Sequence, residues 1–412
     1  MFVRMLAAAT ICLVACGPVA ASDLPIVLGE PEPDLSGAAP GTVLVEEGVP
    51  TEPPAVSVVV DENPPPVTGA DELGLSMAGA AVSCADEPVA WSRYTTVDAL
   101  FMQRPNTVGP LAVENQAAAN PGAPVITAGD VRYPTSPGLR VFQGWRGPDC
   151  TGFEVGYLGI WSMHADALAV SPANDLALPG QLGVIAYSGL DTASAIAPTL
   201  NSTLNSAEFN VFATRVHDGC QRHDPLPWRR SWRMLADTVA TADWLLGIRW
   251  AGLDEQGSLA VTALANSEPQ VFNTTAYRVT SSSQFVGPQL GHRRRVEWGD
   301  WAFEGWAKAA LAARFLSASQ SAVIGPFDLE PIRGPQTASR FGVGMIGDLN
   351  ATIVRRLGDH WGVRAGYTLL WLADAAPAAN QWDFSNTTSS GSQVGVGSVF
   401  LHGATLGLEA AW

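Results

Sequence analysis

Polar and apolar residues alternate with a period of two along ten segments of the chain after residue 92. Alternation of this kind places apolar side chains on one face of a β-strand and polar or small ones on the other. Most of these segments reach the length of about nine to eleven residues that a strand needs to cross a membrane. The segments are 93–103, 138–146, 152–163, 206–216, 242–254, 276–290, 298–315, 340–355, 361–372 and 399–412.

Aromatic residues mark both ends of the apolar face in several segments. Trp361 and Trp371 share one face of their segment, with only apolar or aromatic side chains between them on that face. At roughly 3.3 Å per residue and a tilt near 40°, this interval covers about 25 Å of depth, the height of the apolar band of a membrane barrel. A soluble β-sandwich with these residues in its core is the alternative. We expect the aromatic residues at the lipid interfaces to be Phe153, Trp161, Trp244, Trp250, Trp361, Trp371 and Trp412.

The links between segments alternate in length. The links 147–151, 291–297 and 356–360 are tight, whereas the links on the other side are about twenty residues or longer and rich in Pro, Asn, Ser and Gly. Bacterial outer-membrane barrels have short periplasmic turns and long external loops. The link 217–241 breaks this rule and leaves room for a further strand pair around 228–236. The pattern therefore predicts an all-β, transmembrane, antiparallel up-and-down β-barrel of about 10–12 strands.

The chain ends on the aromatic residue of an alternating segment. Thr405, Gly407, Ala410 and Trp412 follow the polar-x-Gly-x-x-apolar-x-aromatic form. This form resembles the C-terminal signal that the barrel assembly machinery of the bacterial outer membrane reads. The resemblance implies that this machinery is a partner and that the C-terminus lies in the periplasm.

The first 92 residues have a different composition. Residues 1–21 read as a signal peptide with a small-residue cleavage site after Ala21, while a lipobox-like sequence ending at Cys16 leaves lipidation as an alternative. Residues 22–92 contain thirteen Asp or Glu, no Lys or Arg, and repeated Pro. Such a segment buries too little apolar area to offset its ordering entropy, so we expect a disordered periplasmic linker. The barrel domain is then 93–412, in the outer membrane of a diderm bacterium.

Charged residues lie on the strand faces opposite the aromatic residues. Because an Arg on the lipid face costs about 2–4 kcal/mol at the bilayer midplane, these side chains are expected to point inward. An eyelet of opposed charges that selects solutes and a mutually paired, filled lumen both remain open. The pore-lining candidates are Asp243, Arg249, Asp300, Glu304, Lys308, Arg314, Arg340, Asp348, Arg364 and Glu409.

The sequence gives little support to catalysis or metal binding. Cys150 and Cys220 lie in links on the same side and are candidates for a disulfide, with Cys84 left over. The segment 217–223 lacks the spacing of a zinc site, and the chain contains no Gly-x-Ser-x-Gly elbow or phosphate-binding loop. We expect no enzyme, metal, cofactor or nucleic acid. The basic cluster 293–295 is interpreted as part of a tight turn that contacts lipid phosphates or water.

Several motifs resemble, in order, those of the beta-barrel porin-7 family of outer-membrane proteins. They include GLRVFQGW at 138–145, GFEVGY at 152–157 and VRAGYTLLW at 363–371, with weaker matches at 206–211, 245–250, 284–291 and 406–409. The resemblance covers roughly residues 93–412 and implies an outer-membrane barrel surrounded by outer-membrane lipids. We therefore expect a porin-like passive conduit for small solutes. The alternatives are a non-conducting structural or adhesive barrel that presents long loops, and a secreted soluble β-sandwich; oligomeric state is not predicted.

Overall fold

The computed structural model describes residues 92–105, 109–116, 122–147, 149–186, 188–218, 238–264, 272–385 and 393–412. The chain divides into the units Met1–Leu75 and Ser76–Trp412, and all described residues belong to the second. The expected signal peptide and nearly all of the acidic linker lie outside these ranges. Within them, no helix is long and apolar enough to cross a membrane.

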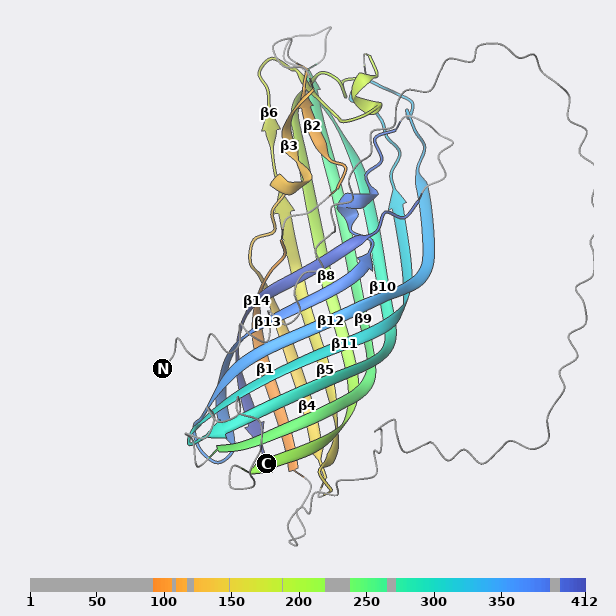
Figure 1. Ribbon diagram of the computed structural model, residues 1–412. Helices are drawn as coiled ribbons and strands as arrows, with labels where there is room; N and C mark the ends of the chain where they lie inside the picture. The colour runs from red at the N-terminus through yellow and green to blue at the C-terminus, as the bar shows by residue number, and fades with distance from the viewer. Residues whose placement is uncertain are drawn as a thin grey trace, which may run out of the picture. The chain divides into compact units, whose positions relative to one another are not determined.

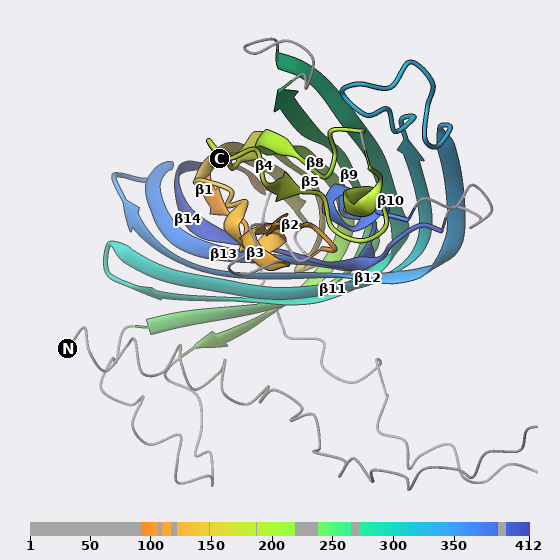
Figure 2. The same ribbon diagram turned by 90° about the horizontal axis from the view of Figure 1, so that it is seen from above.

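Ten antiparallel strands close into a ring of hydrogen bonds (Figure 1; Figure 2). Each strand pairs with the next one along the ring, and β14 pairs with β1 from Tyr94 opposite Ala411 to Gln103 opposite His402. This closure leaves no free edge in the wall. The wall strands are β1 (Ser92–Gln103), β4 (Ser136–Arg146), β5 (Thr151–Asp166), β8 (Ala193–Asp218), β9 (Thr238–Leu264), β10 (Phe272–Trp298), β11 (Trp301–Gln320), β12 (Gln336–Arg356), β13 (Trp361–Ala375) and β14 (Gly397–Ala411).

The strand count is ten, at the lower end of the expected range. β8 and β9 pair with each other directly, from Asp218 opposite Val239 to Ala195 opposite Thr262. The ring therefore has no place between them for the additional strand pair that the link 217–241 allowed. Residues 219–237 themselves lie outside the described residues.

Two predicted links were placed wrongly because the strands continue farther than expected. β10 does not turn at 291–297 but runs to Trp298, and its turn to β11 is Gly299 and Asp300. The link between β9 and β10 is only 265–271, not about twenty residues, because β9 keeps its alternation with the buried residues Leu259, Val261 and Ala263.

The two ends of the barrel differ. The turns 147–150, 299–300 and 357–360 lie at one end, together with Trp412, and we call it the turn end. The other end, the loop end, carries the connections 104–135, 167–192, 321–335 and 376–396. These hold the short strands β2 (Ala112–Asn115), β3 (Ala123–Thr127), β6 (Ala169–Val170) and β7 (Leu176–Ala177), and the 3-10 turns Ala128–Asp130, Leu182–Val184 and Ala378–Gln381.

The outer face of the wall is an apolar belt. On β13, Trp361 is 60% exposed and Tyr367 47%, whereas Arg364 and Thr368 on the alternate face are each 2% exposed. Comparable exposed side chains, such as Ile248 and Leu406, occur on the other wall strands. Soluble monomers rarely expose contiguous apolar patches above a few hundred Å². A surface of this kind fits lipid, and the fold is a transmembrane β-barrel. All seven predicted interface aromatics face outward, with Phe153 half-buried.

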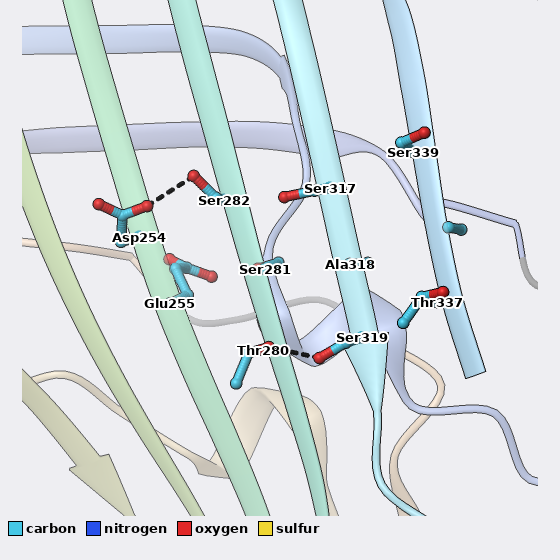
Figure 3. A pocket seen from close by; sticks show the side chains of 11 residues that line it. Asp254, Glu255, Thr280, Ser281, Ser282, Ser317, Ala318, Ser319, Thr337 and Ser339 are labelled. Carbon is cyan, nitrogen blue, oxygen red and sulfur yellow. Dashed lines mark hydrogen bonds between the residues drawn. The ribbon is translucent and has the colours of Figure 1, made fainter. Parts of the chain in front are cut away.

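The belt ends in hydroxyl-bearing side chains on the loop-end side of β9–β12 (Figure 3). Asp254, Thr280, Ser282, Ser317 and Ser319 line a shallow depression of about 600 Å³ there. Several of these groups bond one another, as in Ser282 Oγ to Asp254 Oδ1 at 2.6 Å. Because several of these side chains form hydrogen bonds with one another, we interpret the depression as the polar border of the belt.

Ring closure predicts a specific cross-link between the first and last wall strands. Val97 and Leu408 are direct cross-strand partners, so their Cα atoms lie within the roughly 4.4–6.8 Å that a disulfide spans. The double variant Val97→Cys/Leu408→Cys should form an intramolecular disulfide, read out by mass-spectrometric peptide mapping. The pair Val97→Cys/Leu406→Cys, offset by two residues, is the control. Equal cross-linking of both pairs would contradict the register.

Candidate functional site

A network of buried ion pairs fills the turn-end half of the lumen. Its members come from all ten wall strands, because each strand turns at least one charged side chain inward. Most of its side chains are less than 10% exposed. We call this set the ion-pair network: Asp98, Arg140, Glu154, Glu208, Asp243, Arg249, Arg293, Arg295, Glu304, Lys308, Asp348, Arg364 and Glu409.

Glu154 on β5 is one hub of this network. Its carboxylate accepts from Arg293 Nη1 at 2.7 Å and from Lys308 Nζ at 3.3 Å. Tyr94 donates its hydroxyl to Glu154 Oε2 at 2.6 Å. The same Lys308 ammonium reaches Glu208 Oε1 at 3.0 Å. Charge-assisted bonds of this kind are the strong ones in proteins, and these four join strands that are not neighbours in the ring.

Arg364 on β13 is a second hub. Its guanidinium lies 3.3 Å from Asp98 Oδ1, 3.1 Å from Glu304 Oε1 and 2.9 Å from Glu409 Oε2. Arg295 reaches Glu409 from the far side, with Nη2 2.6 Å from Oε1. Arg364 thus neutralises carboxylates from β1, β11 and β14. It thereby links the β1–β14 pair, which closes the ring, to the interior of the barrel.

Little free space remains beside the network. Arg249 Nη1 pairs with Asp348 Oδ2 at 2.9 Å, and Trp306 donates Nε1–H to the other carboxylate oxygen at 3.1 Å. The cavity bordered by Arg140, Arg249 and Asp348 measures about 10 Å³. A cavity needs about 10–15 Å³ to hold one water molecule. This cavity therefore has no room for a solute in the described conformation.

Apolar side chains fill the loop-end half of the lumen. Inward residues of the wall, including Leu204, Leu253 and Phe285, form one buried cluster with side chains from the connections. The connections 167–192 and 321–335 contribute side chains such as Leu178 and Val323, and the segments 109–116, 122–133 and 376–385 contribute the others. We call these last three segments the mouth cap. Its buried members include Leu111, Val113, Ile126, Tyr133, Trp382 and Phe384. Figure 2 shows β2 and β3 lying within the outline of the ring.

Wall side chains fasten the mouth cap through its backbone. The backbone N–H of Ala378 donates to Glu255 Oε2 at 2.6 Å, and that of Ala376 donates to Ser283 Oγ at 2.9 Å. Gln320 Nε2 donates to the carbonyl of Gln381 at 2.7 Å. Three wall strands, β9, β10 and β11, therefore hold the 376–385 segment across the lumen.

Through Arg104, Glu255 also joins the 122–133 segment of the cap to the wall. Arg104, the residue after β1, pairs with Glu255, and its guanidinium carbon lies 4.8 Å from the centre of the Tyr133 ring. Burial by itself lowers the pKa of Arg104, but the charge and hydrogen bond of the Glu255 carboxylate and the nearby Tyr133 together outweigh burial, and the pKa is raised. Burial raises the pKa of Tyr133. Arg104 therefore stays charged and Tyr133 neutral across the physiological pH range.

Seven of the ten predicted lumen residues belong to the network, and an eighth is buried elsewhere. Arg314 is buried toward the loop end, where Nη1 donates to the Asp374 carbonyl at 2.7 Å. The network members are Asp243, Arg249, Glu304, Lys308, Asp348, Arg364 and Glu409.

Asp300 was wrongly predicted to line the lumen, whereas Arg340 lies on the inner face of β12 but outside the network. Asp300 is exposed in the turn after β10, because that strand is longer than predicted. Arg340 is exposed because β12 pairs with β13 only from Met345 onward, which leaves the lumen-side face near Arg340 open.

The sequence-based prediction missed other members of the network. Glu154 lies between Phe153 and Val155 on a predicted strand, so the alternation already assigned it to the inner face. Arg293 and Arg295 were misread as turn residues, although Gly299 and Asp300 carry the stronger turn signal. In the structure they point inward, while Arg294 between them faces outward and is exposed.

Cys150 is disulfide-bonded. Its backbone carbonyl accepts from the N–H of Thr214 at 2.8 Å, so this turn lies against the end of β8. The predicted partner Cys220 and the segment 217–223 lie outside the residues whose side chains are described, and the pairing stays a prediction. Within the described ranges, no group of three or more His, Cys, Asp or Glu is arranged to hold a metal.

Removing the Arg364 hub should destabilise the barrel. The variant Arg364→Met leaves three carboxylates without their shared cation, and breaking a buried pair of this kind costs about 3–5 kcal/mol of unfolding free energy. The measurement is urea unfolding in lipid vesicles followed by tryptophan fluorescence. The exposed Arg340→Met serves as control and should change the value by about 0.5 kcal/mol or less. Equal losses in both variants would contradict the role of the network.

No protein-family model and no curated protein match this chain. Among solved structures, a Pseudomonas aeruginosa FadL homologue is 9% identical over 78% of this chain and 90% of its own, with a TM-score of 0.20. The P. putida toluene transporter TodX is 10% identical over 81% and 94%, with a TM-score of 0.17. OmpT of Vibrio cholerae is 7% identical over 80% and 99%, with a TM-score of 0.14. Scores this low carry no argument, so the fold rests on the hydrogen-bonded ring, and the porin-7 resemblance stays a prediction.

Proposed function

We propose that this protein is a bacterial outer-membrane β-barrel that forms a narrow conduit for small solutes and is closed in the described conformation. The turn end faces the periplasm and the loop end faces outward, since short periplasmic turns and long external loops are the rule for such barrels. The proposal rests mainly on one observation, the charged lining contributed by all ten strands.

A charged interior is an unusual way to fill a barrel that only needs to be stable. Replacing buried ion pairs by well-packed apolar residues is often neutral or stabilising by about 1–4 kcal/mol. The loop-end half of this lumen shows that the wall also accommodates apolar filling. Opposed charges have a use that apolar side chains lack, because they accept water and ions once they separate. The network therefore supports a path that hydrates when the barrel opens.

The mouth cap is the part that opens in this proposal. Its 376–385 segment is held by bonds to Glu255, Ser283 and Gln320, by Arg333 and Tyr277 near Asp383, and by apolar contacts. Connections of this kind belong to the less stable parts of a fold and open locally more readily than the paired wall strands do. Displacement of the 376–385 segment would expose the network to solvent from outside.

A second candidate function is a barrel that conducts nothing and presents its loop-end connections to the surroundings. The observation that favours it is the filling itself, with paired charges in one half and an apolar cluster in the other. A barrel of about eight strands is filled by side chains, and ten strands leave little more space.

Conductance across a planar lipid bilayer separates the two candidates. The full-length protein should show rare, brief channel steps. The variant Glu255→Ala should raise the open probability about tenfold or more, because it removes charge-assisted bonds that stabilise the closed cap by about 1.5–3 kcal/mol.

Asp254→Ala is the matched control, because Asp254 precedes Glu255 but faces outward and is exposed. It should behave like the unmodified protein. Heat-modifiable mobility on gels verifies that each variant is folded. If neither the protein nor Glu255→Ala gives any channel step at either polarity, the conduit is ruled out and the non-conducting barrel stands.

A further inference from the structure

Two exposed arginines lie side by side on the lipid-facing surface near the turn end. Arg215 on β8 is the cross-strand partner of Ala242 on β9, and Ala242 is in turn the partner of Arg294 on β10. All three side chains face outward. Since neighbouring strands are about 4.8 Å apart, the two arginine Cα atoms lie about 10 Å apart with only a methyl group between them.

Neither guanidinium is neutralised within the described part of the chain. No hydrogen bond or ion pair joins Arg215 or Arg294 to another residue of the described ranges, whereas Arg293 and Arg295, on either side of Arg294, point inward and are paired. Among the outward-facing described residues of β8–β10, no acidic side chain lies between these arginines and Asp254 near the loop end. Among the described residues, the patch is therefore positive.

The membrane side of the patch is apolar. Trp244 follows Ala242 on the same face, and its ring meets that of His292 edge-on at 4.9 Å between centroids. Beyond them lie Leu246, Ile248 and Leu290, which are 58%, 60% and 58% exposed. A tryptophan below a charged border is typical of a lipid interface. The two arginines and the small residue between them thus lie side by side, and the apolar track extends from them toward the bilayer.

We propose that Arg215 and Arg294 form a binding site for the phosphodiester headgroup of an anionic phospholipid, whose acyl chains lie along Leu246, Ile248 and Leu290. Arginine matches phosphate oxygens with paired N–H donors. The small Ala242 side chain lets a phosphate approach the wall between the two guanidinium groups. A soluble phosphate would gain nothing from the apolar track, which favours a lipid as the source. The site does not depend on whether the barrel conducts.

The test is native mass spectrometry of the full-length protein in detergent, titrated with phosphatidylglycerol or with zwitterionic phosphatidylcholine. The protein should retain phosphatidylglycerol in preference to phosphatidylcholine. The double variant Arg215→Gln/Arg294→Gln should bind phosphatidylglycerol at least about fivefold more weakly, the loss expected when charge-assisted bonds become neutral ones.

Arg355→Gln provides the control. Arg355 also faces outward near the turn end, but it stacks over Trp301 at 5.5 Å on a different strand pair. Its replacement should leave phosphatidylglycerol binding unchanged. Because all three positions are exposed, heat-modifiable mobility should be retained in every variant. Undiminished binding by the double variant, or equal retention of both lipids by the unmodified protein, would overturn the proposal.

Discussion

Each charge inside the barrel depends on a partner from another strand, and this mutual dependence organises the whole structure. Removing a charge from water is expensive unless an opposite charge and good hydrogen bonds compensate for it. Arg364 pairs with carboxylates on β1, β11 and β14, and Glu154 pairs with cations on β10 and β11. The partners meet only when the ring is closed and in register. Closure and neutralisation therefore support each other.

The same strands solve the opposite problem on their outer face. There the side chains meet lipid, and polar groups within the belt find partners on neighbouring strands. Tyr367, for example, shares a hydrogen bond of 2.6 Å with His402. Toward the loop end, Trp250 donates its indole N–H to Gln284 at 3.0 Å. The barrel therefore has charged side chains inside and apolar side chains outside. The two-residue period of each strand places both kinds of side chain on the correct face.

This period explains how much could be predicted from the sequence. Alternation located all ten wall strands, the outward aromatic residues and about half of the inward charges, because each of these is a property of one strand. The ends of the strands were predicted less accurately. Arg293 and Arg295 were assigned to a turn because a run of arginines in an alternating segment resembles an exposed link. The pairings within the network and the inward folding of 376–385 could not be predicted, because they depend on the register of strands far apart in the sequence.

The central claim is that the lumen is filled and dry in the resting barrel. Water-edited solid-state NMR of the protein in lipid bilayers tests it without any substitution, because magnetisation spreads quickly from water only to groups that water touches. Ser206, Thr368 and Thr405 face the lumen and are at most 4% exposed. Slow transfer to these residues, compared with the exposed Thr151 at the start of β5, is the predicted result. Transfer to them as fast as to Thr151 would show a water-filled lumen and contradict the account.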